Sequence, residues 1–249
     1  MASGIKILVD PVTDRAAASH QNDGILDIVA IHGIGAHPDD TWSGRGPDGK
    51  RIYWLSDGDM LPKAFPHARI MRFGYESNWN DKTQNNKRTY VSDVADTLLR
   101  ELEFCRRGNA ARPIIFLAHS YGGLILIQAL RRSFDNPSRW ANPFGSTAGI
   151  VFFGTPFRGR RGLSIEAIVE AIAYRDPDQK MPAYQSYPET MALAEEENPY
   201  LQDIVKRFTE TRRGKNPIPL RFFYETKPSP ITKLFPPGSA ISDVSNLIF

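Results

Sequence analysis

The sequence predicts an α/β fold in which helices cover both faces of a mostly parallel sheet. Short apolar runs rich in β-branched and aromatic residues alternate with longer segments of helical periodicity, and this alternation is typical of a parallel sheet. Five of these runs end at or near glycine or polar residues, as buried strands do. The predicted strands are Ile25–Ile31, Ala68–Phe73, Pro113–Ala118, Ala148–Phe153 and Pro219–Tyr224, with Ile5–Val9 as an edge strand.

Three segments between the strands have helical character. Thr89–Arg107 carries an apolar stripe from Val91 to Cys105 on one helical face, and Gly108 follows as a stop signal. Tyr121–Ser133 is apolar nearly all round, which favours a buried helix. A shorter amphipathic helix is marked by Leu201, Ile204, Val205 and Phe208 and ends near Gly214.

The whole chain, residues 1–249, is expected to form a single domain, because no linker-like stretch divides it. Residues 158–215 are long, mixed in character and punctuated by proline. We expect this segment to form a helical cap or cover inserted between two strands of the sheet.

The composition excludes several classes of protein. Gly and Pro account for 19 and 19 of the 249 residues, below the roughly 25–30% that marks low-complexity chains. The single cysteine, Cys105, excludes an intramolecular disulfide and a cysteine-based zinc site. A net charge of +3 without a long run of Lys or Arg does not favour nucleic acid as a partner. No apolar stretch is long enough for a transmembrane helix, which needs about 20 residues.

The strongest chemical motif is Ala118-His119-Ser120-Tyr121-Gly122-Gly123. It follows a predicted strand directly and opens a predicted helix, which is the context of a nucleophile elbow. Such a sharp turn lifts the serine hydroxyl above the sheet, and small residues on either side are needed because backbone segments approach closely. Ala118 stands where glycine is usual and is still small. Ser120 is therefore the candidate nucleophile, although a serine in an ordinary strand-to-helix turn is the alternative.

The second motif is His32-Gly33-Ile34-Gly35, again at the end of a predicted strand. Acyl transfer requires backbone N–H groups directed at the oxyanion, and glycines let such a loop approach the site. The candidate donors are Ile34 or Gly35 in this loop and Tyr121 after the nucleophile.

Two other segments resemble ligand-binding patterns, one for nucleotides and one for metals, but are better explained without a ligand. Gly44–Gly49 fits G-x-G-x-x-G, but no strand precedes it, so a surface turn is expected and not a nucleotide site. His32, His37, Asp39 and Asp40 match no familiar metal-ligand spacing. We expect neither a metal nor a cofactor.

Several segments, taken together and in order, resemble a known family. They are DIVAIHGIGAHPDDTW, ARIMRFGYES, the apolar stripe after Thr89, PIIFLAHSYGGLILIQAL, GIVFFGTPFRG and RFFYET. Together they resemble the α/β-hydrolase-fold serine esterases of the lipase-like group that includes GPI inositol-deacylases and the "serine active site containing" proteins. Similar domains occur at the N-terminus of fungal NACHT and ankyrin receptor-like proteins. The resemblance covers about residues 24–240.

The resemblance implies an α/β-hydrolase fold and hydrolysis of a small-molecule or lipid ester. It implies Ser120 as nucleophile, Ile34, Gly35 and Tyr121 as oxyanion donors, and Glu225 as the acid of a triad ordered Ser, Asp or Glu, His. A solvated carboxylate at a strand end is the alternative for Glu225, and Asp176 or Asp178 are alternative acids.

The chain departs from the family pattern at two places. Phe157 replaces the histidine of a G-T-P-H-x-G motif, and no histidine follows Glu225. The five histidines are His20, His32, His37, His67 and His119. His32 and His119 are expected beside the site, without acting as its base.

A serine without a base is a poor nucleophile. The sequence therefore leaves two readings open: a hydrolase whose last strand and histidine lie beyond Phe249, or a catalytically impaired recognition or signalling module with the same fold. The expected compartment is the cytoplasm, with peripheral attachment to the endoplasmic reticulum or mitochondrial membrane as the alternative. The sequence assigns no oligomeric state.

Overall fold

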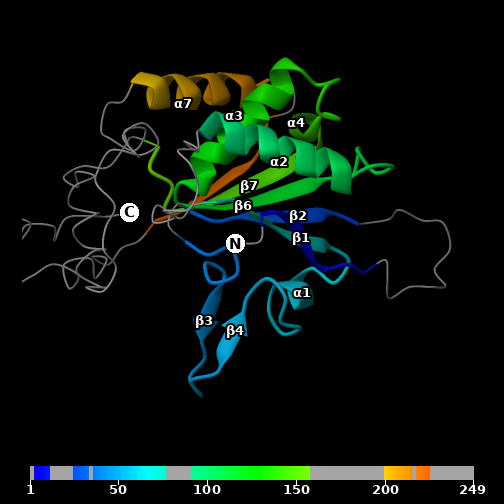
Figure 1. Cartoon of the computed structure of the whole chain (residues 1–249), viewed down its shortest axis with the longest axis vertical. Helices are drawn as coiled ribbons and strands as arrows, with labels where there is room; N and C mark the ends of the chain where they lie inside the picture. The colour runs from blue at the N-terminus through cyan, green and yellow to red at the C-terminus, as the bar shows by residue number, and fades with distance from the viewer. Residues whose placement is uncertain are drawn as a thin grey trace, which may run out of the picture.

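A computed structural model describes residues 3–11, 25–33, 36–76, 91–157, 199–214 and 217–224. Its centre is a six-stranded sheet with the order β1-β5-β2-β6-β7-β8, and Figure 1 shows this sheet edge-on. β1 runs antiparallel to β5, and the other neighbouring strands are parallel. The strands are β1 Gly4–Val9, β2 Asp27–Ile31, β5 Arg69–Gly74, β6 Ile114–His119, β7 Thr147–Phe153 and β8 Leu220–Phe223.

The predicted α/β class is confirmed, and each predicted strand and helix is present with shifts of only a few residues. The central strands β2 and β5 are buried along their whole length, which explains why they appear in the sequence as continuous apolar runs. β1 is an edge strand as expected.

One face of the sheet is covered by helices, as Figure 1 shows. They are α2 Val91–Cys105, α3 Gly122–Asp135, α4 Pro143–Ser146 and α7 Pro199–Arg212. α2 and α7 both pack against α3, and the apolar side chains of all three helices join those of the sheet in one core cluster.

The opposite face has a different cover. A small antiparallel hairpin of β3 Ser43–Arg45 and β4 Arg51–Tyr53 lies there with the one-turn helix α1 Leu61–Ala64. Among the described residues, α2, α3, α4 and α7 thus cover one face of the sheet as predicted, whereas the one-turn helix α1 is the only helix on the opposite face. The hairpin includes Gly44–Gly49, which was expected to be a surface turn. Its turn is closed by Gly49 N–H donating to the Gly46 carbonyl at 2.9 Å.

Part of the predicted cap is described. Residues 199–214 contain α7, the expected amphipathic helix, and Leu201, Ile204 and Phe208 are its buried residues. Residues 158–198 lie outside the described ranges. Among the described residues, no helix is both long enough and apolar enough to cross a lipid bilayer.

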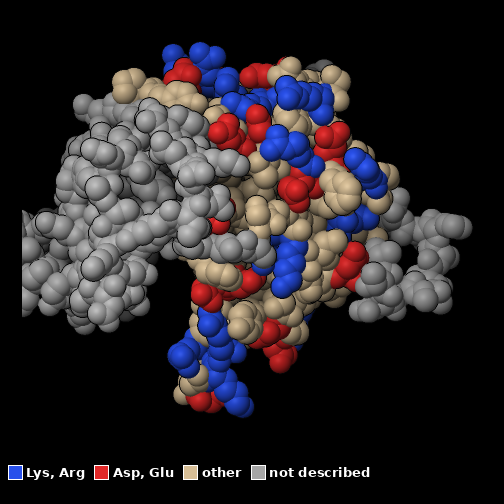
Figure 2. Space-filling view, viewed as in Figure 1, with Lys and Arg blue, Asp and Glu red and all other residues tan. Residues whose placement is uncertain are grey.

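Charged side chains of both signs are interspersed over the visible face of the described part (Figure 2). Lys and Arg are evident over the helices at the top of the view and on the projecting β3–β4 hairpin, where Arg45, Lys50 and Arg51 are exposed. Asp48 and Asp40 form ion pairs with Lys50 and Arg51. The hairpin therefore carries only a small excess of positive charge.

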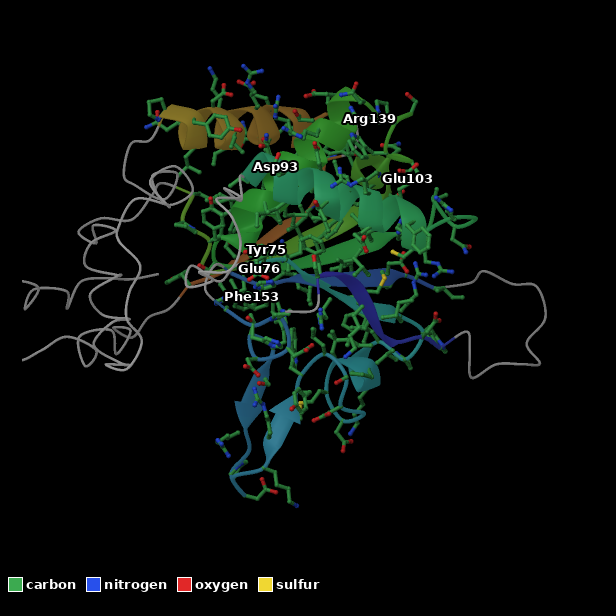
Figure 3. The ribbon with its side chains drawn as sticks, viewed as in Figure 1. Tyr75, Glu76, Asp93, Glu103, Arg139 and Phe153 are labelled. Carbon is green, nitrogen blue, oxygen red and sulfur yellow. The ribbon has the colours of Figure 1, made fainter. Side chains whose placement is uncertain are left out.

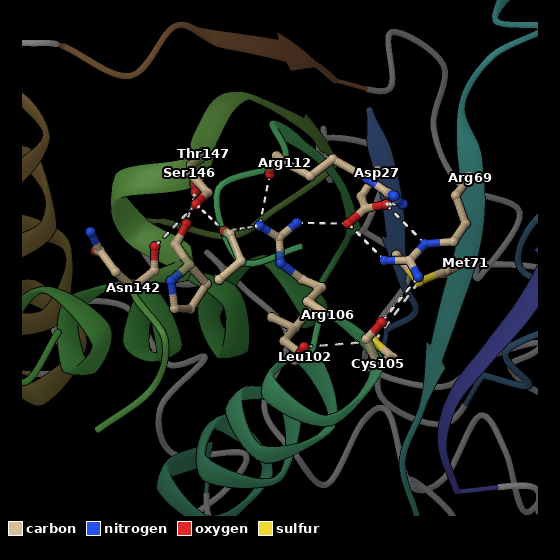
Figure 4. A network of polar contacts seen from close by, with 12 residues as sticks. Asp27, Arg69, Met71, Leu102, Cys105, Arg106, Arg112, Asn142, Ser146 and Thr147 are labelled. Atoms are coloured by element: carbon tan, nitrogen blue, oxygen red, sulfur yellow. Dashed lines mark hydrogen bonds and ion pairs between the residues drawn. The ribbon is translucent and has the colours of Figure 1, made fainter. Parts of the chain in front are cut away.

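A buried ionic cluster joins the starts of two central strands (Figure 4). The carboxylate of Asp27, at the start of β2, is fully buried. It accepts two hydrogen bonds of 2.9 Å from Arg69 of β5, one of 2.6 Å from Arg106 and one of 3.2 Å from Arg112. Arg106 also donates to the carbonyls of Ala110 and Arg112. The cluster therefore ties the loop after α2 to the start of the sheet.

Replacing Asp27 by Asn should lower the free energy of unfolding by about 3–5 kcal/mol, because three arginines would lose the carboxylate that balances their charge. Urea unfolding followed by circular dichroism measures this change. The matched control is Asp48→Asn, where an exposed ion pair with Lys50 is lost and a change below about 1 kcal/mol is expected. Equal effects of the two substitutions would contradict a stabilising role for the cluster.

Candidate active site

Ser120 lies in a strained turn between β6, which ends at His119, and α3, which begins at Gly122. Its φ angle is +50°, a left-handed conformation that non-glycine residues rarely adopt and that is concentrated at functional sites. The Ser120 N–H donates to the Phe153 carbonyl at 2.7 Å, which ties the turn to the end of β7. Strand, turn and helix follow one another as a nucleophile elbow requires.

Two glycines show how closely the segments around Ser120 approach. A Cβ atom on Gly122 would lie 2.4 Å from the His32 carbonyl oxygen and 2.8 Å from that of Ile31. A Cβ on Gly33 would lie 3.0 Å from the Ser120 Cβ. The first turn of α3 is thus packed against the end of β2, and the loop after β2 begins beside Ser120.

Tyr121 occupies the N-cap position of α3. Its side chain is buried, and this burial raises the pKa of the phenol. The backbone N–H groups of this first turn lie at the positive end of the helix dipole, which favours negative charge nearby.

A polar clamp holds the end of β2. The buried His32 ring stacks on Tyr75 with centroids 4.2 Å apart. Its Nδ1 donates to the Gly33 carbonyl at 2.8 Å, and its Nε2 accepts from the Tyr75 N–H at 3.2 Å. The Tyr75 hydroxyl donates to the His32 carbonyl at 3.1 Å. Because both ring nitrogens are engaged, His32 is held as the neutral tautomer that positions Gly33.

The other described histidines occupy different places. His119 borders the site, since its ring packs edge-to-face on Trp42 at 6.4 Å and its Nδ1 lies close to Gly33. His37 Nδ1 accepts from the Asp39 N–H at 3.2 Å. His67 precedes β5 and so lies toward the opposite edge of the sheet from Ser120.

The carboxyl ends of the parallel strands bring these residues together. Tyr75 directly follows β5, and Phe153 is the last residue of β7. Figure 3 shows both residues at the same end of the sheet. Ligands of open α/β sheets bind at this edge. The Tyr75 contact was missed by sequence reasoning, because only the position of Tyr75 directly after a buried strand could have indicated it.

Several predicted site residues cannot be placed. Ile34, Gly35 and Glu225 lie outside the described residues, as do the alternative acids Asp176 and Asp178. Phe157 is described, and its ring packs on Phe152 and Phe222 at 4.9 and 5.8 Å. Among the described residues, no group of three His, Cys, Asp or Glu side chains could hold a metal ion.

The mostly parallel sheet and the strained serine turn between β6 and α3 together identify the architecture. The fold is an α/β-hydrolase fold. Solved structures with similar folds include the mature lipase BlEst2 of Bacillus licheniformis, with a TM-score of 0.47, 14% identity and coverage of 84% of this chain and 69% of that one. A 2-hydroxy-6-oxo-6-phenylhexa-2,4-dienoate hydrolase from Rhodococcus sp. strain RHA1 has a TM-score of 0.39, 15% identity and coverage of 85% and 62%.

No model of a known protein family matches the sequence. Protein SERAC1 of Danio rerio is 27% identical over 147 residues, which cover 53% of this chain and 22% of that protein. Protein SERAC1 of Mus musculus is 25% identical over 218 residues, which cover 82% of this chain and 30% of that protein. The matched part thus spans less than a third of the length of these curated relatives, and this hydrolase-fold chain is distantly related to them.

Replacing Gly122 by Ala should lower the free energy of unfolding by about 1–3 kcal/mol, because the new Cβ would meet backbone oxygen atoms of β2 that cannot easily move. Thermal unfolding provides the measurement. Gly58→Ala is the matched control, since nothing lies within 4 Å of a Cβ there and a change within about 0.5 kcal/mol is expected. If both variants unfold at the same temperature as the unmodified protein, the result would contradict the close approach of α3 to β2.

Stability should depend on pH through His32. Burial lowers the pKa of His32 from 6.5 to about 4, so the unfolded chain takes up a proton at a higher pH than the folded chain. The stability of the fold with a neutral, buried His32 is fully present above pH 6.5. It falls by on the order of 3 kcal/mol as the pH drops toward 4, because the unfolded chain binds the proton first.

The measurement is urea unfolding of the unmodified protein and of His32→Asn between pH 7 and pH 4. The variant should be less stable at pH 7 and should lose less stability on acidification, while carboxylates contribute equally to both proteins. Identical losses in the two proteins would rule out a buried neutral His32.

Proposed function

We propose that this chain is a serine hydrolase that cleaves a carboxylic ester of a small molecule or lipid, with Ser120 as its nucleophile. The observation that carries the proposal is the left-handed backbone of Ser120 at the turn from β6 to α3. Such a turn costs on the order of 1–3 kcal/mol and places a hydroxyl at the carboxyl edge of the sheet, where an acyl group can reach it.

The proposed oxyanion donors are the backbone N–H groups of Ile34, Gly35 and Tyr121. The proximity of Gly33 to the Ser120 side chain supports this assignment, because residues 34 and 35 follow Gly33 directly. The stack of His32 on Tyr75 supports it further by holding the start of the loop. Preorganised donors of this kind stabilise the negative charge that develops on the carbonyl oxygen.

In the proposed reaction, Ser120 Oγ attacks the ester carbonyl carbon as its proton passes to a base. The tetrahedral intermediate expels the alcohol, which takes up that proton, and leaves an acyl-serine. Water then hydrolyses the acyl-serine and releases the carboxylic acid. Glu225 is proposed as the acid that orients the base.

The finer substrate assignment belongs to the same proposal. The resemblance to GPI inositol-deacylases and "serine active site containing" proteins makes lipid esters the first substrates to screen. We also propose that residues 1–249 form one domain with residues 158–215 as its cap, and the packing of α7 on α3 supports this organisation.

A fluorophosphonate probe tests the nucleophile. The probe should label the protein at Ser120, located by peptide mass spectrometry, and Ser120→Ala should not be labelled. Hydrolysis of p-nitrophenyl butyrate should fall by at least about 10³-fold in the same variant. Ser133→Ala is a serine control within α3, to be read for labelling alone. A well-folded protein that takes no label at Ser120 would overturn the proposal.

A second candidate is a recognition module with the same fold and without turnover. It is favoured by the geometry of His32, whose two ring nitrogens are both hydrogen-bonded within the clamp and so do not face Ser120 as a base. This candidate requires that Ser120→Ala leave partner or ligand binding unchanged. Ester hydrolysis that depends on Ser120 would exclude it.

A further inference from the structure

The loop after β2 carries two of the proposed oxyanion donors, so the contacts at both of its ends decide where these donors lie. At its start, Gly33 is fixed by the polar clamp at the end of β2. Only Ile34 and Gly35 separate Gly33 from Ala36. Because a chain spans at most about 3.3–3.6 Å per residue, whatever holds the segment from Ala36 onward also restricts the two donors.

Asp39 ties the far end of this loop to the sheet. Its carboxylate accepts hydrogen bonds from Arg72 Nε and Nη2 at 2.8 and 3.2 Å, one on each oxygen. A paired contact of this kind fixes orientation as well as distance. Arg72 is 2% exposed and belongs to β5, which is buried along its whole length. Asp39 is therefore held to a rigid part of the molecule.

A compact turn passes this restraint back toward the donors. The N–H and the hydroxyl of Thr41 both donate to the His37 carbonyl at 3.0 Å. The Asp39 N–H donates to His37 Nδ1 at 3.2 Å. Residues 37–41 are thus closed on one another, so that anchoring Asp39 also anchors His37, two positions after Gly35.

The two ends of the loop are held from opposite faces of the sheet. Tyr75, which holds the start, belongs to the core cluster on the helix side, as do Met71 and Phe73 of β5. Arg72 lies between Met71 and Phe73 in the strand, and alternation along a strand directs its side chain to the hairpin face. One strand and the residue that follows it therefore supply both anchors.

The contact between Asp39 and Arg72 is an ion pair at neutral pH. Partial burial of Asp39 acts to raise the pKa of its carboxyl, but the hydrogen bond and charge of Arg72, with smaller contributions from Lys6 and His37, lower the pKa below its usual value. The carboxylate thus stays charged under the conditions of an esterase assay.

We propose that Asp39 is a positioning residue for ester hydrolysis: its ion pair with Arg72 holds the loop so that the N–H groups of Ile34 and Gly35 face the oxyanion formed at Ser120. This inference rests on the proposed function of Ser120. Asp39 acts through the loop and does not touch the substrate. Because oxyanion donors interact most strongly with the transition state, loss of the anchor lowers kcat and leaves KM nearly unchanged.

Steady-state hydrolysis of p-nitrophenyl butyrate tests the catalytic part. In Asp39→Ala, kcat should fall about 10- to 100-fold with KM within about twofold, since small displacements of catalytic groups are costly. Asp39→Asn keeps an acceptor for Arg72 without the charge and should lie between. Asp40→Ala is the matched control and should keep kcat, because this neighbouring carboxylate pairs with the exposed Arg51 of the hairpin.

Hydrogen–deuterium exchange tests the anchor without any need for turnover. In Asp39→Ala, backbone amides in the peptide spanning residues 33–41 should exchange at least about 10-fold faster, because local opening becomes easier. The amides of α3 should be unchanged, and Asp40→Ala should match the unmodified protein. Circular dichroism establishes that each variant is folded.

The outcomes separate this inference from the proposed function. Unchanged exchange in Asp39→Ala would refute the anchor whatever the activity. Faster exchange with an unchanged kcat, or a rise in KM in place of the fall in kcat, would refute the positioning role. An unmodified protein that takes no fluorophosphonate label at Ser120 would instead refute the proposed function, and with it the catalytic part of this inference, while the exchange rates still decide whether Asp39 anchors the loop.

Discussion

The close packing of the first turn of α3 against the end of β2 is the constraint on which the candidate site depends. Gly122 allows the helix to approach the backbone oxygens of Ile31 and His32, at the end of β2, to a distance that no side chain would permit. This approach brings the strained turn at Ser120 and the loop that begins at Gly33 to the same edge of the sheet. A helix that stood farther away would separate the hydroxyl from the proposed oxyanion donors.

The two ends of the parallel strands have different roles. At the amino ends of β2 and β5, the Asp27 cluster is buried and its carboxylate is surrounded by guanidinium groups, which is suited to stability. At the carboxyl ends, Ser120 is partly accessible and its surroundings combine glycines, a helix N-terminus and the neutral His32. Parallel strands create this asymmetry, because all of their carboxyl ends meet on one side.

The two candidate functions differ in whether a base can accept the proton of the Ser120 hydroxyl. The fold and the serine turn suit acyl transfer, but a serine hydroxyl needs a base to become an effective nucleophile. His32 is committed to the clamp with Tyr75, and its depressed pKa keeps it neutral at physiological pH. Labelling of Ser120 therefore reports on more than the presence of the residue, since it requires that a proton acceptor reach the hydroxyl.

The sequence by itself determined the strands, the main helices and the small residues around Ser120, because hydrophobic periodicity and turn chemistry are local properties of the chain. It missed the β3–β4 hairpin, whose three-residue strands are too short to show alternation. Only the tertiary structure decided which residues meet: His32 and Tyr75 are 43 positions apart, and Asp27 and Arg106 are 79 apart. Strand register likewise places Lys6 of β1 opposite Arg72 of β5, whose guanidinium pairs with Asp39, and this arrangement cannot be read from composition.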